Sequence, residues 1–520
     1  MPKLVGAIDQ GTTSTRFVIF DQSGSIVALH QIQSTQHYPQ PGVTDIDDTN
    51  RWVEQDPYEM LDLAKACMEH AVRKLNGTGY TSSDIQAIGV TNQRETTLAW
   101  DKLTGLPLYP AIIWSDARTT ETVQKLAATS DKGIDALRSV CGLPLTNYFS
   151  AVKMRWLLDN IPMVAEAQEQ GRLQFGTLDT WLIYNLTGGA EQNGVLVTDV
   201  TNASRTMLMD IHTLQWSEEA LSFFGLEMQT LPKIASSSQV YGTLQEGSLA
   251  GVPIAGCLGD QQAALVGQKC FGAGDAKNTY GTGCFMLFNT GNTPVLSDNG
   301  LISTVAYQFG NDAPSYALEG SVAVAGSSIS WLRDNLKLIS SVDQLNDLAA
   351  QVPDTAGVYF VTAFGGLFAP YWRDDARGTI CGLTQFTTLH HLARATLEAV
   401  CYQSRAILDA MNKEANTPLR ALKVDGGISN SDLCMQIQSD ILGITVERPS
   451  MRESTALGSA MAAGLAVGVW ESIHDLAHVN VQGKTDFTPA IDMKKREHMY
   501  NGWQEAVKRS FGWTTSNPQA

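Results

Sequence analysis

The sequence predicts an α/β fold made of two related halves. Short β-branched runs alternate with longer stretches of helical periodicity, as expected for strands and helices in turn. An apolar strand, a Gly/Thr turn and a second strand occur at residues 6–21 and again at 278–289. Glycines cluster between residues 265 and 275, so we expect one domain over 1–268 and a second over 269–520.

The individual elements follow in chain order. Strands are predicted at residues 4–8, 17–21, 85–91, 254–258, 278–280, 284–289, 422–424 and 444–447. Helices are predicted at residues 56–75, 151–159, 327–338 and 391–413. The uncharged stretch 456–470 is shorter than the about 20 residues that span a bilayer, so we interpret it as a buried helix.

Composition narrows the functional classes. The chain of 520 residues carries 53 acidic and 36 basic residues, a net charge of −17, which argues against nucleic acid as a partner. Its eight cysteines are scattered with no Cys-x-x-Cys pair, which is typical of a reducing compartment. The first residues contain no apolar signal region, and we expect a cytoplasmic protein without a membrane segment.

The sharpest local motif is DQGTTSTR at residues 9–16, between two predicted strands. A tight turn at Gly11 lets the backbone approach a ligand, and the amides and hydroxyls of Thr12, Thr13 and Ser14 can surround phosphate oxygens. Asp9 could hold Mg²⁺ through water, and Arg16 could add positive charge. The alternative is an ordinary polar hairpin loop.

Two further glycine turns strengthen the phosphate interpretation. Gly281-Thr282-Gly283 and Asp425-Gly426-Gly427 each end an apolar strand, and the second leads into a predicted helix N-terminus. Three such turns resemble the actin, hexokinase and heat-shock ATPase fold. That resemblance implies two ribonuclease H-like domains around a nucleotide cleft.

Candidate acceptor residues stand apart from these turns. Arg94 and Glu95 are adjacent, so both can face one pocket only if the chain bends there. Such a donor beside an acceptor suits a polyol, whereas an exposed ion pair is the commoner reading of two neighbouring charges. Asp260 joins a strand to a helix and could be a general base, a helix cap or both.

Longer strings add a family resemblance. YFSAVKMRW at 148–156 is similar to the signature of the FGGY carbohydrate kinases. NQRET at 92–96, GDQQA at 259–263 and GLFAPYWR at 366–373 resemble the members of that family that act on glycerol. The resemblance covers residues 4–505 and implies ATP-dependent phosphorylation of glycerol to sn-glycerol 3-phosphate, in a homo-oligomer that is a dimer or tetramer.

The same resemblance assigns roles. Asp260 would be the general base. Glycerol would be bound by Arg94, Glu95, Trp114, Tyr148, Asp260, Gln261 and Phe285. ATP would be held by Thr12, Thr13, Ser14, Arg16, Thr282, Gly326, Ser330, Gly427 and Ser431, and Mg²⁺ by Asp9 and Asp260. Ser330 and Ser431 depart from the family, which usually carries glutamine and asparagine there, and the insertion at 43–51 has no assigned role.

Two alternatives stay open at this point. The first is a kinase of the same fold that phosphorylates another polyol or a ketose, against which Arg94-Glu95 and Trp114 argue. The second is a chaperone-like ATPase whose nucleotide state drives partner binding. The sequence contains no separate peptide-binding domain to support the second alternative.

Overall fold

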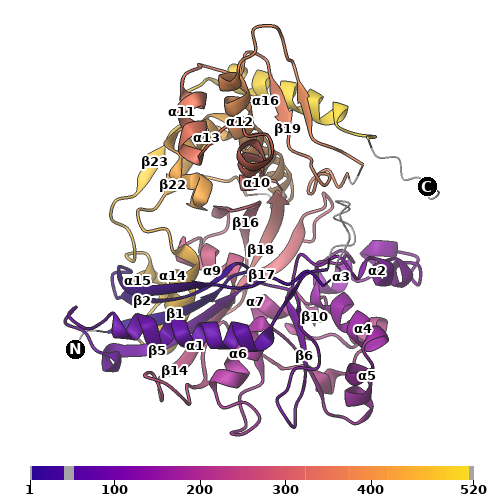
Figure 1. Ribbon diagram of the computed structural model, residues 1–520, viewed down its shortest axis with the longest axis vertical. Coiled ribbons are helices and arrows are strands. Elements are labelled where there is room, and N and C mark those ends of the chain that lie inside the picture. Colours follow the sequence, from indigo (N-terminus) through magenta and orange to yellow (C-terminus); the bar gives the residue numbers. More distant parts are fainter. Residues whose placement is uncertain (1–2, 40–51, 323, 374, 416, 514–520) are drawn as a thin grey trace.

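The two halves stand one above the other in Figure 1, with the N-terminal half below. The computed structural model describes residues 3–39, 52–322, 324–373, 375–415 and 417–513. The insertion at 43–51 and the end of the chain from residue 514 lie outside the described residues.

Each half is built on one large mixed sheet, and the two sheets share a topology. The first sheet has the order β13 (Ser238–Thr243), β14 (Pro253–Gly259), β5 (Ile85–Asn92), β1 (Leu4–Gln10), β2 (Ser14–Asp21), β3 (Ile26–Gln33). The second has the order β17 (Ile302–Tyr307), β18 (Ser315–Val322), β16 (Cys284–Gly291), β15 (Ala276–Tyr280), β21 (Ala421–Gly426), β22 (Thr445–Arg448), β23 (Thr485–Phe487).

The shared topology confirms the predicted repeat. In the first sheet β1 is antiparallel to β2 and parallel to β5, which is parallel to β14. In the second sheet β15 is antiparallel to β16 and parallel to β21, which is parallel to β22. The hairpins β1–β2 and β15–β16 therefore occupy equivalent places, and the predicted two-sheet α/β fold is confirmed.

Smaller sheets and helices complete the halves. One smaller sheet has four strands in the order β4 (Glu54–Gln55), β7 (Ala111–Ile112), β6 (Thr97–Asp101), β8 (Leu173–Thr177). Three further sheets have two strands each: β10 (Met209–Asp210) with β11 (Gln215–Trp216), β9 (Val197–Asp199) with β12 (Lys233–Ala235), and β19 (Tyr359–Val361) with β20 (Thr379–Cys381). Helices of the first half are α1 (Pro57–Arg73), α2 (Thr120–Ala127), α3 (Arg138–Cys141), α4 (Ser150–Asn160), α5 (Pro162–Glu169), α6 (Leu178–Leu186), α7 (Val200–Ala203), α8 (Glu218–Phe224) and α9 (Asp260–Gly267). Those of the second half are α10 (Gly326–Ser330), α11 (Val342–Ala350), α12 (Leu389–Ala415), α13 (Asp432–Leu442), α14 (Ser454–Ala466), α15 (Ile473–Leu476) and α16 (Met493–Arg509).

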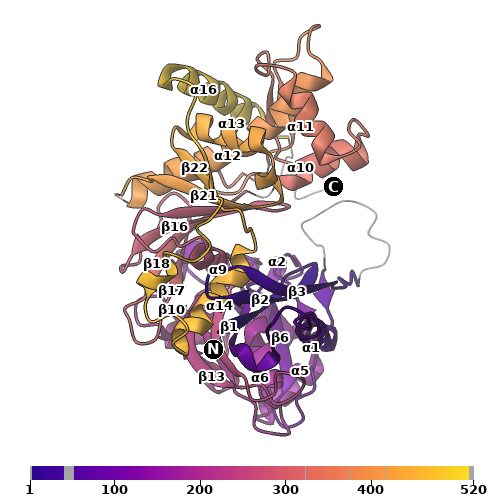
Figure 2. The same cartoon turned by 90° about the vertical axis from the view of Figure 1, so that its left-hand side faces the viewer.

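Helix α14 is the buried helix that the stretch 456–470 predicts, but it packs in the first half. Figures 1 and 2 show it beside β1, β2 and α9, far from the neighbouring α13. A Cβ at Gly458 would lie 1.8 Å from Ala263 O, and one at Gly89 would lie 2.1 Å from Ser459 O. Backbones this close require glycine. The helix thereby ties the end of the second half to the first sheet.

Two expectations differ from the structure. The helix predicted over 327–338 is α-helical only as α10, after which the turns widen to a π-helix over Trp331–Asn335, where Trp331 packs on Phe360 and Phe364. Five strands of the two large sheets were not predicted, namely β3 and β13 in the first sheet and β17, β18 and β23 in the second. No helix among the described residues is both long and apolar enough to cross a membrane.

Candidate active site

The turn between β1 and β2 has the predicted strand–turn–strand geometry. The Gly11 N–H donates to Ser14 O at 3.0 Å, and Thr13 is exposed at the tip. Thr12 joins this hairpin to the neighbouring pocket, because its Oγ1 accepts from Trp114 Nε1 at 2.9 Å and donates to Gln93 Oε1 at 3.1 Å. The hairpin is thus hydrogen-bonded to Trp114, one of the candidate acceptor residues.

Asp9 and Arg16 face each other across the hairpin. They are paired in the strand register, and Arg16 Nε lies 3.4 Å from Asp9 Oδ2. Burial raises the pKa of Asp9 to about 6, against the opposing effect of Arg16. Arg16 Nη1 also bonds to Glu453, the residue before α14, a contact that the sequence did not predict.

The second turn lies between β15 and β16 and contacts the start of α10. Gly326 N donates to Gly281 O at 3.1 Å, and Ser327 N donates to Thr282 O at 3.1 Å. A Cβ at Gly326 would lie 2.6 Å from Gly281 O, so a larger residue would push the turn away. Gly326 and Thr282, predicted as nucleotide contacts, are therefore brought together.

The third turn follows β21. Gly426 has φ of 84°, a left-handed conformation, and a Cβ there would lie 2.3 Å from Tyr280 O at the end of β15. A Cβ at Gly427 would meet no atom within 4 Å, so this glycine borders open space. The second and third turns are adjacent, as a shared nucleotide site requires.

Ser330 and Ser431 behave differently from each other. Ser431 is the N-cap of α13, where its Oγ accepts from Cys434 N at 3.1 Å and donates to Asn346 Oδ1 at 2.7 Å. Ser330 is the last residue of α10, half-buried. The Ser431 hydroxyl hydrogen is already engaged within the protein, so a nucleotide contact there stays a prediction.

Arg94 and Glu95 lie in the loop after β5, and the chain bends there as predicted. Glu95 has φ of 60°, and both side chains are buried, at 2% and 1% exposure, so the exposed ion-pair reading is wrong. They do not form an ion pair with each other either, as the exposed alternative would require. Arg94 binds Glu319 through two hydrogen bonds, and Glu95 Oε1 accepts from Arg205 Nε at 2.6 Å.

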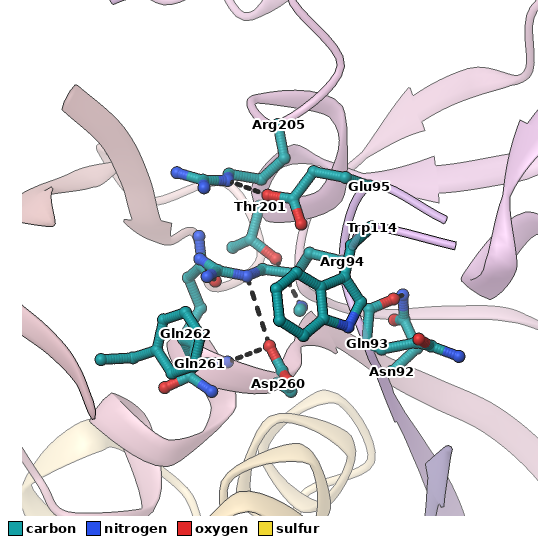
Figure 3. A network of polar contacts seen from close by, with 12 residues as sticks. Asn92, Gln93, Arg94, Glu95, Trp114, Thr201, Arg205, Asp260, Gln261 and Gln262 are labelled. Atoms are coloured by element: carbon teal, nitrogen blue, oxygen red, sulfur yellow. Dashed lines mark hydrogen bonds and ion pairs between the residues drawn. The ribbon is translucent and has the colours of Figure 1, made fainter. Parts of the chain in front are cut away.

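Asp260 is the first residue of α9 and stands beside Arg94, as Figure 3 shows. Its Oδ1 accepts from Gln261 N at 2.7 Å and lies 3.3 Å from Arg94 Nε. Its side chain keeps 28% exposure, so the carboxylate is accessible in a buried setting. Burial raises its pKa, opposed by Arg94 and then Lys277. The N-cap of α9 is Gly259, so the helix-cap alternative for Asp260 is wrong, whereas its accessible carboxylate can still accept a proton.

Three half-buried aromatic rings form a wall near these charges. The Trp114 ring lies 5.9 Å from the Tyr148 ring and 6.2 Å from the Phe285 ring, in edge-to-face geometry. Phe285 comes from β16 of the second half, whereas the other two come from the first half. Such rings can cover the carbon atoms of a small ligand.

Lys277 on β15 is buried and connects the pocket to the turns. Its Nζ donates to Gln261 Oε1, to Thr279 Oγ1 at 3.0 Å and to Phe285 O at 3.2 Å. Burial lowers its pKa to about 8, and Asp425 and Asp260 act in the opposite direction. Asp260 likewise contributes to raising the pKa of Asp9. Lys277 thus joins Gln261, next to Asp260, to Phe285 of the second half.

A buried polar cluster supports the start of α9. Among the described residues, Asp179, Asp199 and Cys257 are close enough to share a metal ion. However, each carboxylate already accepts several hydroxyl or amide hydrogens, for example from Thr201 Oγ1 to Asp199 at 2.9 Å. Thr201 Oγ1 in turn accepts from Gly259 N at 2.9 Å, directly before Asp260. We therefore interpret the cluster as a support for this backbone.

Sequence reasoning missed Glu319, Arg205 and Lys277. A signal existed for two of them, because Glu319 and Lys277 are lone charges within the otherwise uncharged strands β18 and β15. Arg205 lies in a loop after α7 and follows no pattern that would have revealed it.

Known proteins resemble the whole chain. The FGGY family of carbohydrate kinases matches with its N-terminal domain over residues 4–267 and its C-terminal domain over 276–467. Proteins named glycerol kinase from Roseiflexus sp. (strain RS-1) and Chloroflexus aurantiacus (strain ATCC 29366 / DSM 635 / J-10-fl) are 51% and 52% identical over 513 residues, 99% of this chain and 100% of theirs.

A solved structure agrees with these sequence relatives. The crystal structure of Plasmodium falciparum glycerol kinase with ADP has 38% identity and a TM-score of 0.88, covering 98% of each chain. On the family matches, the relatives and this structural likeness together, the chain belongs to the FGGY family of carbohydrate kinases.

Proposed function

We propose that this protein transfers the γ-phosphate of ATP to glycerol, giving sn-glycerol 3-phosphate. The observation that carries the proposal is the accessible Asp260 carboxylate beside the buried Arg94, close to Trp114, which is itself hydrogen-bonded to the hairpin at Thr12 (Figure 3). The names of relatives about 50% identical over nearly the full chain support the same substrate.

The pocket offers a donor and an acceptor to hydroxyl groups. Arg94 has five N–H groups, of which Glu319 takes two, Gln262 one and Asp260 one. One N–H on Nη2 is thus left for a ligand. Glu95 uses Oε1 for Arg205, and no hydrogen bond within the described part of the chain occupies its Oε2. A triol can accept from the first and donate to the second.

Asp260 provides the base for the transfer. The terminal hydroxyl of glycerol gives its proton to the Asp260 carboxylate as its oxygen bonds to the γ-phosphorus. The bond from that phosphorus to the bridging oxygen of ADP breaks, and ADP leaves. The raised pKa of Asp260 makes it a stronger base than an exposed aspartate. Closure of the halves over the reactants would exclude water, which would otherwise hydrolyse ATP.

The three glycine turns would hold ATP. The hairpin with Thr12, Thr13, Ser14 and Arg16 would bind the phosphates. The turn at Thr282, with the adjoining Gly326, and the turn at Gly427 would border the rest of the nucleotide. Gly427 fits this role because it faces open space. Asp9 and Asp260 would hold Mg²⁺, which suits their carboxylate oxygens and would neutralise phosphate charge when bound.

The setting of the reaction is a further part of the proposal. We expect a homo-oligomer in the cytoplasm, where ATP is supplied. All eight cysteines are free and seven are buried, in keeping with a reducing compartment. Light scattering coupled to size exclusion would measure the oligomer directly.

A substrate panel tests the proposal. Purified protein with MgATP would be given glycerol, dihydroxyacetone, xylulose or gluconate, with ADP detected by a coupled assay. The proposal predicts the highest kcat/KM for glycerol and little ADP without an acceptor. A higher kcat/KM for a ketose would favour a different kinase of the family, and ATP turnover indifferent to all four would favour an ATPase.

A further inference from the structure

We propose that Glu319 and Arg205 are positioning residues that determine acceptor specificity, by holding Arg94 and Glu95 apart and oriented toward the ligand. This inference rests on the proposed function. It concerns two residues outside the predicted site, one of them supplied by the second half of the molecule.

The four side chains form one alternating chain of charge. Glu319 Oε2 accepts from Arg94 Nη1 at 2.5 Å and its Oε1 accepts from Nη2 at 3.0 Å, a two-pronged pair of fixed geometry. The same Oε1 accepts from Arg205 Nη2 at 3.2 Å, and Arg205 Nε donates to Glu95 Oε1. Figure 3 shows Arg205 reaching Glu95 on one side and Arg94 reaching Asp260 on the other.

This arrangement explains how Arg94 and Glu95, adjacent and oppositely charged, both remain able to bind a ligand. Paired directly, Arg94 and Glu95 would satisfy each other and offer a ligand little. The inserted Glu319–Arg205 pair satisfies each of them from the side away from the ligand. What remains is the single Nη2 hydrogen of Arg94 and the Oε2 of Glu95, a donor and an acceptor for neighbouring hydroxyls.

Burial makes the orientation strict. Arg205 and Glu319 have 0% exposure, so water cannot replace either partner. Burial alone would raise the pKa of Glu319, yet Arg205 and Arg94 lower it to about 2, so it is ionised throughout the working range. Buried ion pairs seldom add stability over apolar side chains, so a positional role is the better explanation for retaining this one. The guanidinium of Arg205 also packs against the Tyr148 ring, with its Cζ 5.5 Å from the ring centre.

The ion pairs of Glu319 with Arg94 and Arg205 connect the two halves. Glu319 belongs to β18 in the second sheet, whereas Arg94, Arg205 and Glu95 belong to the first half. The hydroxyl-binding edge of Arg94 therefore has the correct direction only when the second half is in place. Acceptor recognition and the relative position of the halves are coupled through this contact.

The test compares Glu319→Gln with a matched control, Glu398→Gln. Glu398 is a buried glutamate that pairs with Arg394 at 3.1 Å in α12, away from the pocket. For each variant we would measure thermal unfolding, KM for glycerol and for ATP, and the ratio of kcat/KM for glycerol to that for propane-1,2-diol, which lacks one hydroxyl.

For Glu319→Gln we expect glycerol KM to rise roughly 10- to 100-fold, ATP KM to change less than about threefold, and the glycerol-to-diol ratio to fall roughly tenfold. Glu398→Gln should leave all three kinetic values within about threefold of wild type. In an Arg94→Ala background, Glu319→Gln should cause no further loss, because it acts through Arg94. Equal loss on both acceptors, or a full further loss in that background, would overturn the proposal.

Two controls keep the test decisive. If Glu319→Gln does not fold, Glu319→Asp keeps the charge but shortens its reach: a raised glycerol KM supports the proposal, and a wild-type KM overturns it. Wild type is assayed in parallel. A wild type that does not phosphorylate glycerol refutes the proposed function, whereas an active wild type with an equally selective Glu319→Gln refutes this inference alone.

Discussion

Replacing Asp260 by asparagine separates a catalytic role of this residue from a structural one. In the structure Asp260 Oδ1 accepts from Gln261 N at 2.7 Å and lies 3.3 Å from Arg94 Nε. Asparagine has the same shape and can keep both contacts through its own Oδ1. Arg94 also retains its two bonds to Glu319. The substitution therefore removes one negative charge, and with it the atom that accepts a proton and one of the two carboxylates proposed to hold Mg²⁺.

The size of the effect follows from the role. A general base contributes about 10² to 10⁴ in rate, which corresponds to about 3 to 5 kcal/mol of transition-state free energy. Glycerol still meets Arg94, Glu95 and the aromatic wall, so its dissociation constant should change less than about tenfold. We therefore expect kcat for Asp260→Asn to fall at least about 100-fold while glycerol binding persists.

A coupled ADP assay would give kcat, and isothermal titration would give glycerol affinity. The matched control is Asp492→Asn, because Asp492 caps α16 by accepting from Lys495 N at 2.8 Å and lies outside the site. It should retain wild-type kcat. A kcat for Asp260→Asn within about threefold of wild type would refute the base assignment and leave Asp260 only its structural contacts with Gln261 and Arg94.

Three other predictions concern binding and pH. Arg94→Ala should raise glycerol KM at least about 100-fold, because the substitution leaves the buried Glu319 with one partner fewer. An unchanged KM in steady-state kinetics would place Arg94 outside the pocket. Gly326→Ala places a Cβ 2.6 Å from Gly281 O, so ATP KM should rise roughly tenfold while glycerol affinity, measured by titration, stays constant. Burial raises the folded-state pKa of Asp9 from 3.8 to about 6. This raised pKa contributes to the free energy of unfolding in full below pH 3.8, and the contribution is lost as pH rises through 6. Urea unfolding at pH 5 and pH 7.5 should therefore show the free energy of unfolding of wild type falling by about 1 kcal/mol relative to that of Asp9→Asn. An equal difference between the two proteins at both pH values would contradict the raised pKa.

Local patterns predicted the frame of the molecule well. The hairpin at 9–16 and its echo at 278–289 are short apolar strands around glycine turns, so their structure depends mainly on neighbouring residues. Their equivalent places in two sheets follow from the repeat. The bend at Glu95 was predictable because adjacent strand residues cannot face one pocket.

Long-range pairing could not be predicted in the same way. Adjacent Arg94 and Glu95 suggested a direct pair, but their partners are 225 and 110 residues away in sequence. Strand β18, which carries Glu319, was not predicted, so Glu319 could not be recognised as the partner of Arg94. Which charges meet in a buried pocket depends on how the two sheets are placed, and no local pattern encodes that.

The fate of the γ-phosphate tests the proposed transfer to glycerol most directly. Purified protein, Mg²⁺, ATP and glycerol would be followed by ³¹P NMR, with the product identified by a stereospecific glycerol-phosphate dehydrogenase. We expect one sn-glycerol 3-phosphate for each ADP formed. ADP accompanied by inorganic phosphate, at a rate that glycerol does not change, would contradict it.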